Sequence, residues 1–148
     1  MPVIVVGGDS KIGRGIVHYL AERPGEVRVF VSSAEAATTL RSRGVKIAVG
    51  DLSDESHVGA AATGAYCAVL ITEAAYDGRT FAFAEPDGVV EGWLRAVGEA
   101  GVTRVIVVGT PRIPVSVATS EMRVLATDDM TTEAITHAVA ALDEAQRL

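Results

Sequence analysis

Short runs of β-branched and other apolar residues alternate with segments of helical periodicity along most of this sequence. Such runs are typical of strands in a parallel sheet, because helices on both sides of the sheet bury both faces of each strand. We expect five strands of this kind, at residues 3–6, 27–31, 46–49, 66–72 and 104–109. The sequence therefore predicts an α/β fold, a doubly wound parallel sheet between two layers of helices, with the strand order 3-2-1-4-5.

The segments between the first strands have the apolar spacing of helices. The first helix is expected to begin near Lys11 and to end at Pro24-Gly25, since proline and glycine both stop a helix. Ser32 and Glu35 have the spacing of a capping box, so we expect Ser32 to cap the second helix.

The second half of the sequence has further helices and one further strand. Helices are expected at 55–62, at 89–100 and after Asp128-Asp129, whose charges suit the N-terminus of a helix. Residues 122–126 predict a sixth strand beyond the fifth. Between the fourth strand and the next helix, residues 73–88 lose all periodicity and predict a long loop, which usually has a function or is mobile.

Length and composition narrow the class of protein. At 148 residues the chain is expected to form one domain, residues 1–148, and it has no apolar run near the roughly 20 residues that span a bilayer. A net charge of −6 without a basic block argues against nucleic-acid and membrane partners. We expect a cytoplasmic protein. Its single cysteine, Cys67, is expected to be a packing residue, and its three histidines lack the spacing of a metal site.

One turn suggests a ligand. The stretch "VVGGDSKIGRG", residues 5–15, leads from the first strand into the first helix through several glycines. A turn with few side chains lets a phosphate approach the free N–H groups at the helix N-terminus. Asp9 works against this use, because a carboxylate about 6 Å from a phosphate costs on the order of 3 kcal/mol at an effective dielectric of about 20. Alternatively, Asp9 or Ser10 simply caps the helix.

The chain resembles the atypical short-chain dehydrogenase/reductases, especially their NmrA-like members. Gly7, Ser10 and Gly13 lie on the three positions of that family's G-x-x-G-x-x-G turn. The phrases "KIGRGIV", "GVKIAVGDLSD", "AATGAYCAVLIT" and "AGVTRVIVVGT" follow in the family's order, so the resemblance covers about residues 1–110. A "GDxxD" phrase is also shared with nucleotide-sensing domains of potassium-transport regulators, whose turn is one residue shorter.

The resemblance implies a Rossmann-like domain that binds a dinucleotide, NAD or NADP. Gly7, Ser10, Lys11, Ile12 and Gly13 would line the pyrophosphate. Asp51 and Leu52 would meet the adenine, and Thr72 would flank the ribose on the nicotinamide side. Ser10 replaces the family's second glycine, and its hydroxyl is able to donate to a phosphate oxygen.

The choice of cofactor depends on the end of the second strand. An NAD site usually has an acidic residue there for the ribose 2′-hydroxyl, whereas this chain has Val31-Ser32-Ser33. We therefore expect NADP somewhat more than NAD, with Ser32 among the cofactor-binding residues, and the alternative is that no nucleotide binds.

The catalytic residues are unknown. Reductases of this superfamily commonly use a tyrosine with a lysine four residues later, the lysine lowering the phenol's pKa. The only lysines here are Lys11 and Lys46, and no tyrosine lies beyond the fifth strand. Thr110 is at the family's serine position, where a hydroxyl would meet a substrate carbonyl.

Three functions remain open from the sequence. The first is a nucleotide sensor or accessory binding protein. Its aromatic loop at residues 76–83 is expected either to fold over a ligand or to contact a second subunit, and the homodimer is slightly favoured. The second is a minimal NADPH-dependent reductase of a small, easily reduced, quinone-like molecule. The third is a scaffold that binds no nucleotide and acts through protein contacts.

Overall fold

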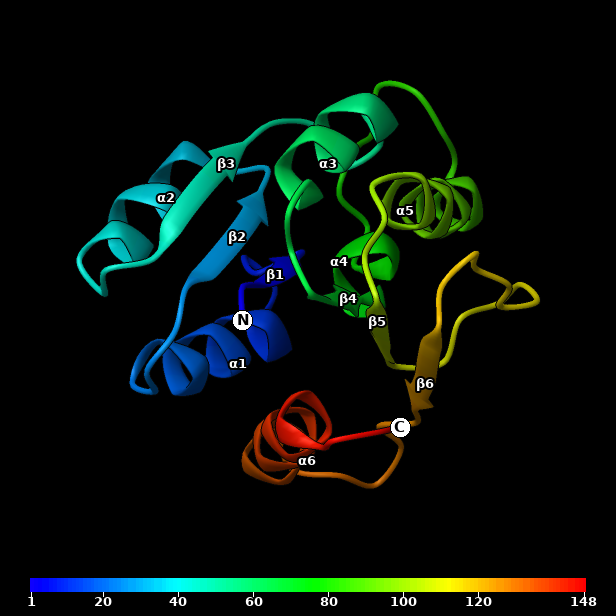
Figure 1. Cartoon of the computed structure of the whole chain (residues 1–148). Coiled ribbons are helices and arrows are strands. Elements are labelled where there is room, and N and C mark those ends of the chain that lie inside the picture. The colour runs from blue at the N-terminus through cyan, green and yellow to red at the C-terminus, as the bar shows by residue number, and fades with distance from the viewer.

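One six-stranded sheet runs through the middle of the molecule, and all its strands are parallel (Figure 1). The computed structural model describes residues 1–148. The strand order is β3-β2-β1-β4-β5-β6, which confirms the predicted order and the sixth strand. The strands are β1 (Val3–Val6), β2 (Val27–Val31), β3 (Lys46–Val49), β4 (Cys67–Ile71), β5 (Arg104–Val108) and β6 (Glu121–Leu125).

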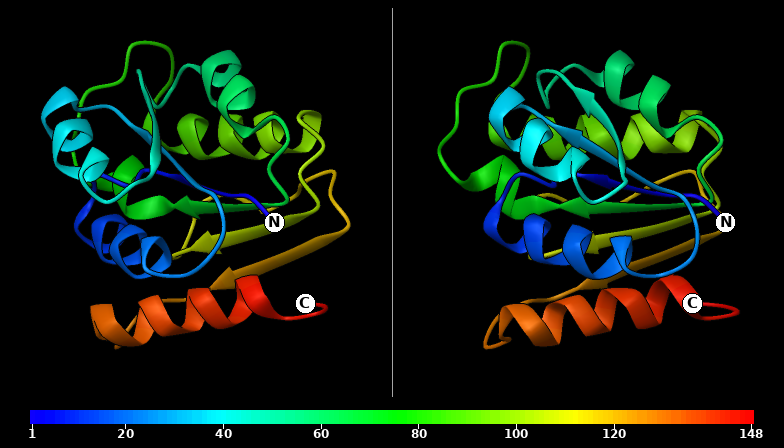
Figure 2. Two further views of the ribbon diagram at one scale, coloured as in Figure 1. Left: turned by 60° about the vertical axis from the view of Figure 1, so that its left-hand side comes forward. Right: turned by 90° about the vertical axis from the view of Figure 1, so that its left-hand side faces the viewer.

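Helices cover both faces of this sheet. They are α1 (Lys11–Ala21), α2 (Ala34–Arg41), α3 (Glu55–Ala62), α4 (Thr72–Tyr76), α5 (Pro86–Glu99) and α6 (Thr132–Glu144). Figure 2 shows α6 and α1 below the sheet and α3 and α5 above it, so the predicted three-layer architecture is confirmed. None of these helices combines the length and the hydrophobicity that crossing a bilayer requires.

The core consists of two apolar clusters, one on each side of the sheet. Along β1, Ile4 and Val6 belong to the cluster under α3 and α5, whereas Val3 and Val5 belong to the cluster under α1, α2 and α6. Each fully buried aliphatic side chain contributes about 1.5–3 kcal/mol to folding, and β1 buries all four of its residues. Burial on both faces explains why these strands appear in the sequence as continuous apolar runs.

Cys67 lies in the second of these clusters and is fully buried. Burial raises the pKa of its thiol well above the ordinary value. The prediction that it serves as a packing residue is confirmed.

The region predicted as one long loop is partly helical. The helix α4 follows β4 directly, and α5 begins at Pro86 rather than near Val89, because proline suits the first turn of a helix. The irregular part is therefore residues 77–85, which we call the covering loop.

One predicted helix cap is wrong. Ser33, not Ser32, caps α2, and its hydroxyl oxygen accepts the N–H of Ala36 at 3.2 Å. The cap of α6 is Thr131, and Asp128-Asp129 lie before this cap, as predicted. Either serine satisfies the local preference for a cap, and a tertiary contact of Ser32 described below decides between them.

A hydrogen bond from Trp93 fixes the segment after β3. Its indole N–H, on α5, donates to the carbonyl of Leu52 at 2.8 Å, and both residues are buried. This bond holds Leu52 between α5 and the sheet, which sets the position of the adjacent Asp51 at the carboxyl end of β3.

Replacing Trp93 by phenylalanine is expected to lower the free energy of unfolding by about 2 kcal/mol, because the Leu52 carbonyl loses its buried partner. Urea denaturation followed by circular dichroism measures this, since Trp93 is the only tryptophan. The control is Phe83→Leu at a side chain that is 70% exposed. It should change stability by less than about 0.5 kcal/mol. If both changes lower the free energy of unfolding equally, the indole hydrogen bond does not contribute to stability.

Candidate functional site

The cofactor residues that the resemblance implies gather at one edge of the sheet. The turn at Gly7–Gly13 follows β1, Ser32 follows β2, Asp51 follows β3 and Thr72 follows β4. In an open parallel sheet, ligands bind outside the carboxyl ends of the strands, where the strand order reverses. Here the reversal lies between β1 and β4, next to the glycine turn.

The turn holds α1 very close to the end of β1. A Cβ on Gly13 would lie 2.3 Å from the carbonyl oxygen of Gly7 and 2.9 Å from the Cα of Gly8. Gly7 has a φ of +88°, and a Cβ there would lie 2.7 Å from the Cβ of Ala74. Both positions therefore require glycine, and the helix N-terminus faces the carboxyl edge as a phosphate site needs.

Ser10 caps α1. Its hydroxyl oxygen accepts the N–H of Gly13 at 2.9 Å, and the residue is buried. Lys11, the first residue of the helix, is exposed. The hydroxyl of Ser10 thus satisfies one of the N–H groups predicted to meet a phosphate.

A second of these N–H groups is also satisfied by the protein itself. The N–H of Ile12 donates to a carboxylate oxygen of Glu73 at 2.9 Å. Glu73 lies in the first turn of α4, and its negative charge is stabilised by the positive end of the α1 dipole. A pyrophosphate at this turn would compete with Glu73 for the same donor.

The carboxylate of Asp9 points toward Ser32 and Arg79 and not toward the position expected for a phosphate at the N-terminus of α1. One carboxylate oxygen accepts both the backbone N–H and the hydroxyl of Ser32 at 3.0 Å, and the other accepts an N–H of Arg79 at 2.8 Å. The Asp9 side chain is only 5% exposed. The acid at the N-terminus of α1 is therefore Glu73, and Asp9 instead ties the glycine turn to the end of β2.

Arg79 reaches this site from the covering loop. Its Nε and Nη2 atoms donate to the carboxylate of Asp77, and its Nη1 atom donates to Asp9 and, at 3.0 Å, to the hydroxyl of Ser32. The pKa of the guanidinium is raised above its ordinary value by Asp77 and then by Asp9, in spite of partial burial.

The covering loop is also bonded to the end of β3. The N–H of Ala82 donates to Asp51 at 2.9 Å, and the N–H of Phe83 donates to the hydroxyl of Ser53 at 3.0 Å. Partial burial by itself would raise the pKa of Asp51, but hydrogen bonds from Ser53 and Ala82 outweigh it and lower the pKa below the ordinary value. Leu52 is fully buried.

On α4, the hydroxyl groups of Thr72 and Tyr76 already have hydrogen-bond partners within the protein. The hydroxyl of Thr72 is buried and donates to the carbonyl of Val108 at 2.8 Å. Tyr76 donates to Asp87 at 2.8 Å and accepts the backbone N–H of Arg112 at 3.2 Å. Burial raises the pKa of its phenol. Thr110 is exposed beyond the end of β5.

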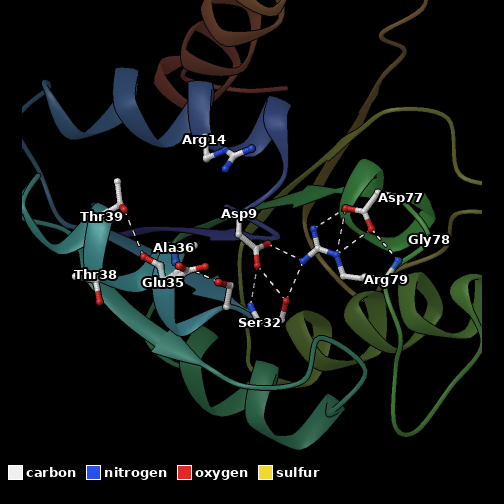
Figure 3. A pocket seen from close by; sticks show the side chains of 11 residues that line it. Asp9, Arg14, Ser32, Glu35, Ala36, Thr38, Thr39, Asp77, Gly78 and Arg79 are labelled. Atoms are coloured by element: carbon white, nitrogen blue, oxygen red, sulfur yellow. Dashed lines mark hydrogen bonds and ion pairs between the residues drawn. The ribbon is translucent and has the colours of Figure 1, made fainter.

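An open cleft of about 950 Å³ lies where β2 ends, between α1, α2 and the covering loop. Figure 3 shows Asp9 between Ser32 and Arg79 in this cleft, with Arg14 on α1 free of any dashed line to the other lining residues. Its lining is polar and charged: Asp9, Arg14, Ser32, Ser33, Glu35, Ala36, Thr38, Thr39, Asp77, Gly78 and Arg79.

The parallel sheet, the glycine turn and the helix N-terminus at its switch point define a dinucleotide-binding type of domain. The sequence matches the family described as NAD(P)H-binding over residues 7–147, and the chain belongs to that family. A comparison with curated proteins gives no match.

Solved structures with the same fold include several reductases. ChuY, an anaerobillin reductase from Escherichia coli O157:H7, is 26% identical, with a TM-score of 0.58 over 74% of this chain and 51% of ChuY. Triphenylmethane reductase from Citrobacter sp., complexed with NADP(H), is 22% identical, with a TM-score of 0.61 over 74% of this chain and 37% of that one. The quinone oxidoreductase QOR2 from Escherichia coli, complexed with NADPH, is 16% identical, with a TM-score of 0.59 over 72% and 36%.

The chain thus matches about half of ChuY and little more than a third of the other two proteins.

Neutralising Glu73 is expected to strengthen dinucleotide binding. In Glu73→Gln the amide oxygen still accepts the N–H of Ile12 but lacks the charge that the helix dipole stabilises by about 1 kcal/mol, so the Kd for NADPH should fall about fivefold. Titration calorimetry measures this change.

The matched control is Glu99→Gln, since α5 ends at the opposite edge of the sheet and the charge change is the same. Affinity that rises equally in both variants would mean that only the net charge matters.

Proposed function

We propose that this protein is a nucleotide sensor or accessory binding protein, one that binds a dinucleotide at the carboxyl edge of the sheet and responds through its covering loop. The observation that carries this proposal is the loop's attachment to the predicted groove. Arg79 is bonded to Asp9, Ala82 to Asp51 and Phe83 to Ser53.

These three contacts connect ligand and loop. A dinucleotide that reaches the ends of β2 and β3 has to share or replace the partners that the loop now uses. Binding energy released at the groove is therefore coupled to the position of residues 77–85, and a ligand shifts a conformational equilibrium only through such differential contacts. A loop that moves with the ligand is a means of reporting occupancy to a partner.

The positions of the two lysines and of Tyr76 support a binding role. Lys46 pairs with Glu26 at the amino end of its strand, far from the carboxyl edge, and Lys11 lies on α1. Tyr76 has both a donor and an acceptor bond within the protein, and burial raises its pKa, which disfavours proton transfer near neutral pH. The proposal therefore assigns no Tyr–Lys acid–base pair to this chain.

We propose NADP(H) as the preferred dinucleotide. Arg14 and Arg79 line the cleft at the end of β2, where a 2′-phosphate would lie, and β2 is followed by two serines rather than an acid. The names of two structural relatives, which include NADP(H) and NADPH, agree with this choice.

Thermal unfolding with and without cofactor tests the proposal. NADPH at about 100 times its Kd should stabilise the protein by about 2.7 kcal/mol and raise its Tm. The rate of trypsin cleavage after Arg79 should change when NADPH binds, because the covering loop shifts. The rate of cleavage after Arg147 should stay the same. If neither NADPH nor NADH raises the Tm, the binding proposal is wrong and the scaffold function is favoured.

The second candidate is a minimal NADPH-dependent reductase, favoured by the reductase names of the structural relatives. A quinone needs little proton transfer from the protein, because hydride delivery leaves a hydroquinone anion that takes its proton from water. Oxidation of NADPH by a soluble quinone should be no faster with the protein than without it if the sensor proposal holds. Catalysed turnover that Gly13→Val abolishes would favour the reductase instead.

A further inference from the structure

We propose that Arg79 determines which dinucleotide the groove accepts, by exchanging its partner Asp9 for the 2′-phosphate of NADPH. This inference rests on the proposed binding function and adds to it the residue that sets the cofactor choice. The structure contains the first of the two pairs in this exchange, and the cleft beside it provides the space for the second.

The guanidinium of Arg79 has one fixed edge and one edge able to change partner. Its Nε and Nη2 atoms face Asp77, two residues away on the same loop, at 2.9 and 2.6 Å. Its Nη1 atom alone makes the long-range contacts, to Asp9 and to Ser32. Loss of the Asp9 contact would therefore leave Arg79 oriented by Asp77 and aimed at the end of β2.

Asp9 tolerates this exchange because it has other donors. Its second carboxylate oxygen accepts the N–H and the hydroxyl of Ser32, so it stays hydrogen-bonded when Arg79 turns away. An arginine–phosphate pair is charge-assisted and often bidentate, so the guanidinium gains at least as strong a partner as it loses.

The charges around the cleft explain why a 2′-phosphate would need Arg79 in order to bind there. Three acids, Asp9, Glu35 and Asp77, line it beside two cations, Arg14 and Arg79. Arg14 has no hydrogen-bond or ion-pair partner among these residues (Figure 3). A 2′-phosphate entering this excess of acids is favoured only near both guanidinium groups.

NADH offers Arg79 no such exchange. Its ribose 2′-hydroxyl is neutral and would use a carboxylate as acceptor, as in NAD sites generally. Here that carboxylate is Asp9, which comes from the glycine turn rather than from the end of β2. When it turns to the ribose, the Nη1 atom of Arg79 loses an anionic partner and gains none.

The test is the ratio of the Kd values for NADPH and NADH in matched variants, measured by titration calorimetry. The wild-type protein should bind NADPH at least about tenfold more tightly, equivalent to about 1.4 kcal/mol. Arg79→Gln should weaken NADPH binding about tenfold and should not weaken NADH binding, since a hydrogen bond to a charged group is lost only with NADPH. Asp9→Asn should strengthen NADPH binding and weaken NADH binding.

Two controls separate specificity from folding. Arg95→Gln removes an equally charged arginine that pairs with Glu55 outside the cleft, and it should leave the ratio unchanged. The double variant Asp9→Asn with Arg79→Gln leaves no unpaired buried charge, so it keeps the test available if Arg79→Gln alone fails to fold. Its preference for NADPH should be clearly smaller than that of Asp9→Asn alone.

The outcomes distinguish this proposal from the binding function beneath it. If the wild-type protein binds neither dinucleotide, the proposed function itself is wrong. If it binds NADPH but Arg79→Gln weakens NADPH and NADH by the same factor, binding stands and the role of Arg79 in specificity is overturned. A wild-type preference for NADH also overturns it.

Discussion

The close approach of α1 to the end of β1 is the constraint on which the whole site depends. With no Cβ on Gly13, the helix starts almost on top of the carbonyl of Gly7, so its N–H groups face the carboxyl edge of the sheet. Two acceptors at that edge are bonded to these donors. Ser10 takes one from within the turn, and Glu73 takes another from α4. A side chain at Gly13 would move the helix and leave these acceptors without their donors.

The protein's own carboxylates occupy the places where the phosphates of a dinucleotide are expected. Glu73 provides an anion at the helix N-terminus, and Asp9 provides one beside the end of β2, where it pairs with Arg79. A domain of this kind stays well hydrogen-bonded without ligand, and its affinity reflects the difference between internal and external partners rather than the contacts of the ligand alone.

The sequence predicts the fold far better than these side-chain partners. Strands such as β1 bury both faces and helices such as α1 bury one, so periodicity alone reveals them. The capping of α2 shows what local sequence cannot predict. Ser32 and Ser33 have the same local preference for a helix cap, but Asp9, over twenty residues earlier, bonds to Ser32 and leaves Ser33 to cap the helix. Glu73 and Arg79 carry no local signal either, because their roles arise only when α4 and the covering loop fold back on the turn.

The burial of Cys67 gives the molecule a practical property. Only a thiolate reacts with alkylating dyes, and the single native thiol is enclosed in the core with its pKa raised. The folded protein therefore has no native thiol that reacts with such dyes. Phe83, 70% exposed on the covering loop, is a position where Phe83→Cys would create one addressable thiol. A dye attached there would follow the loop in real time without any need to delete a native cysteine.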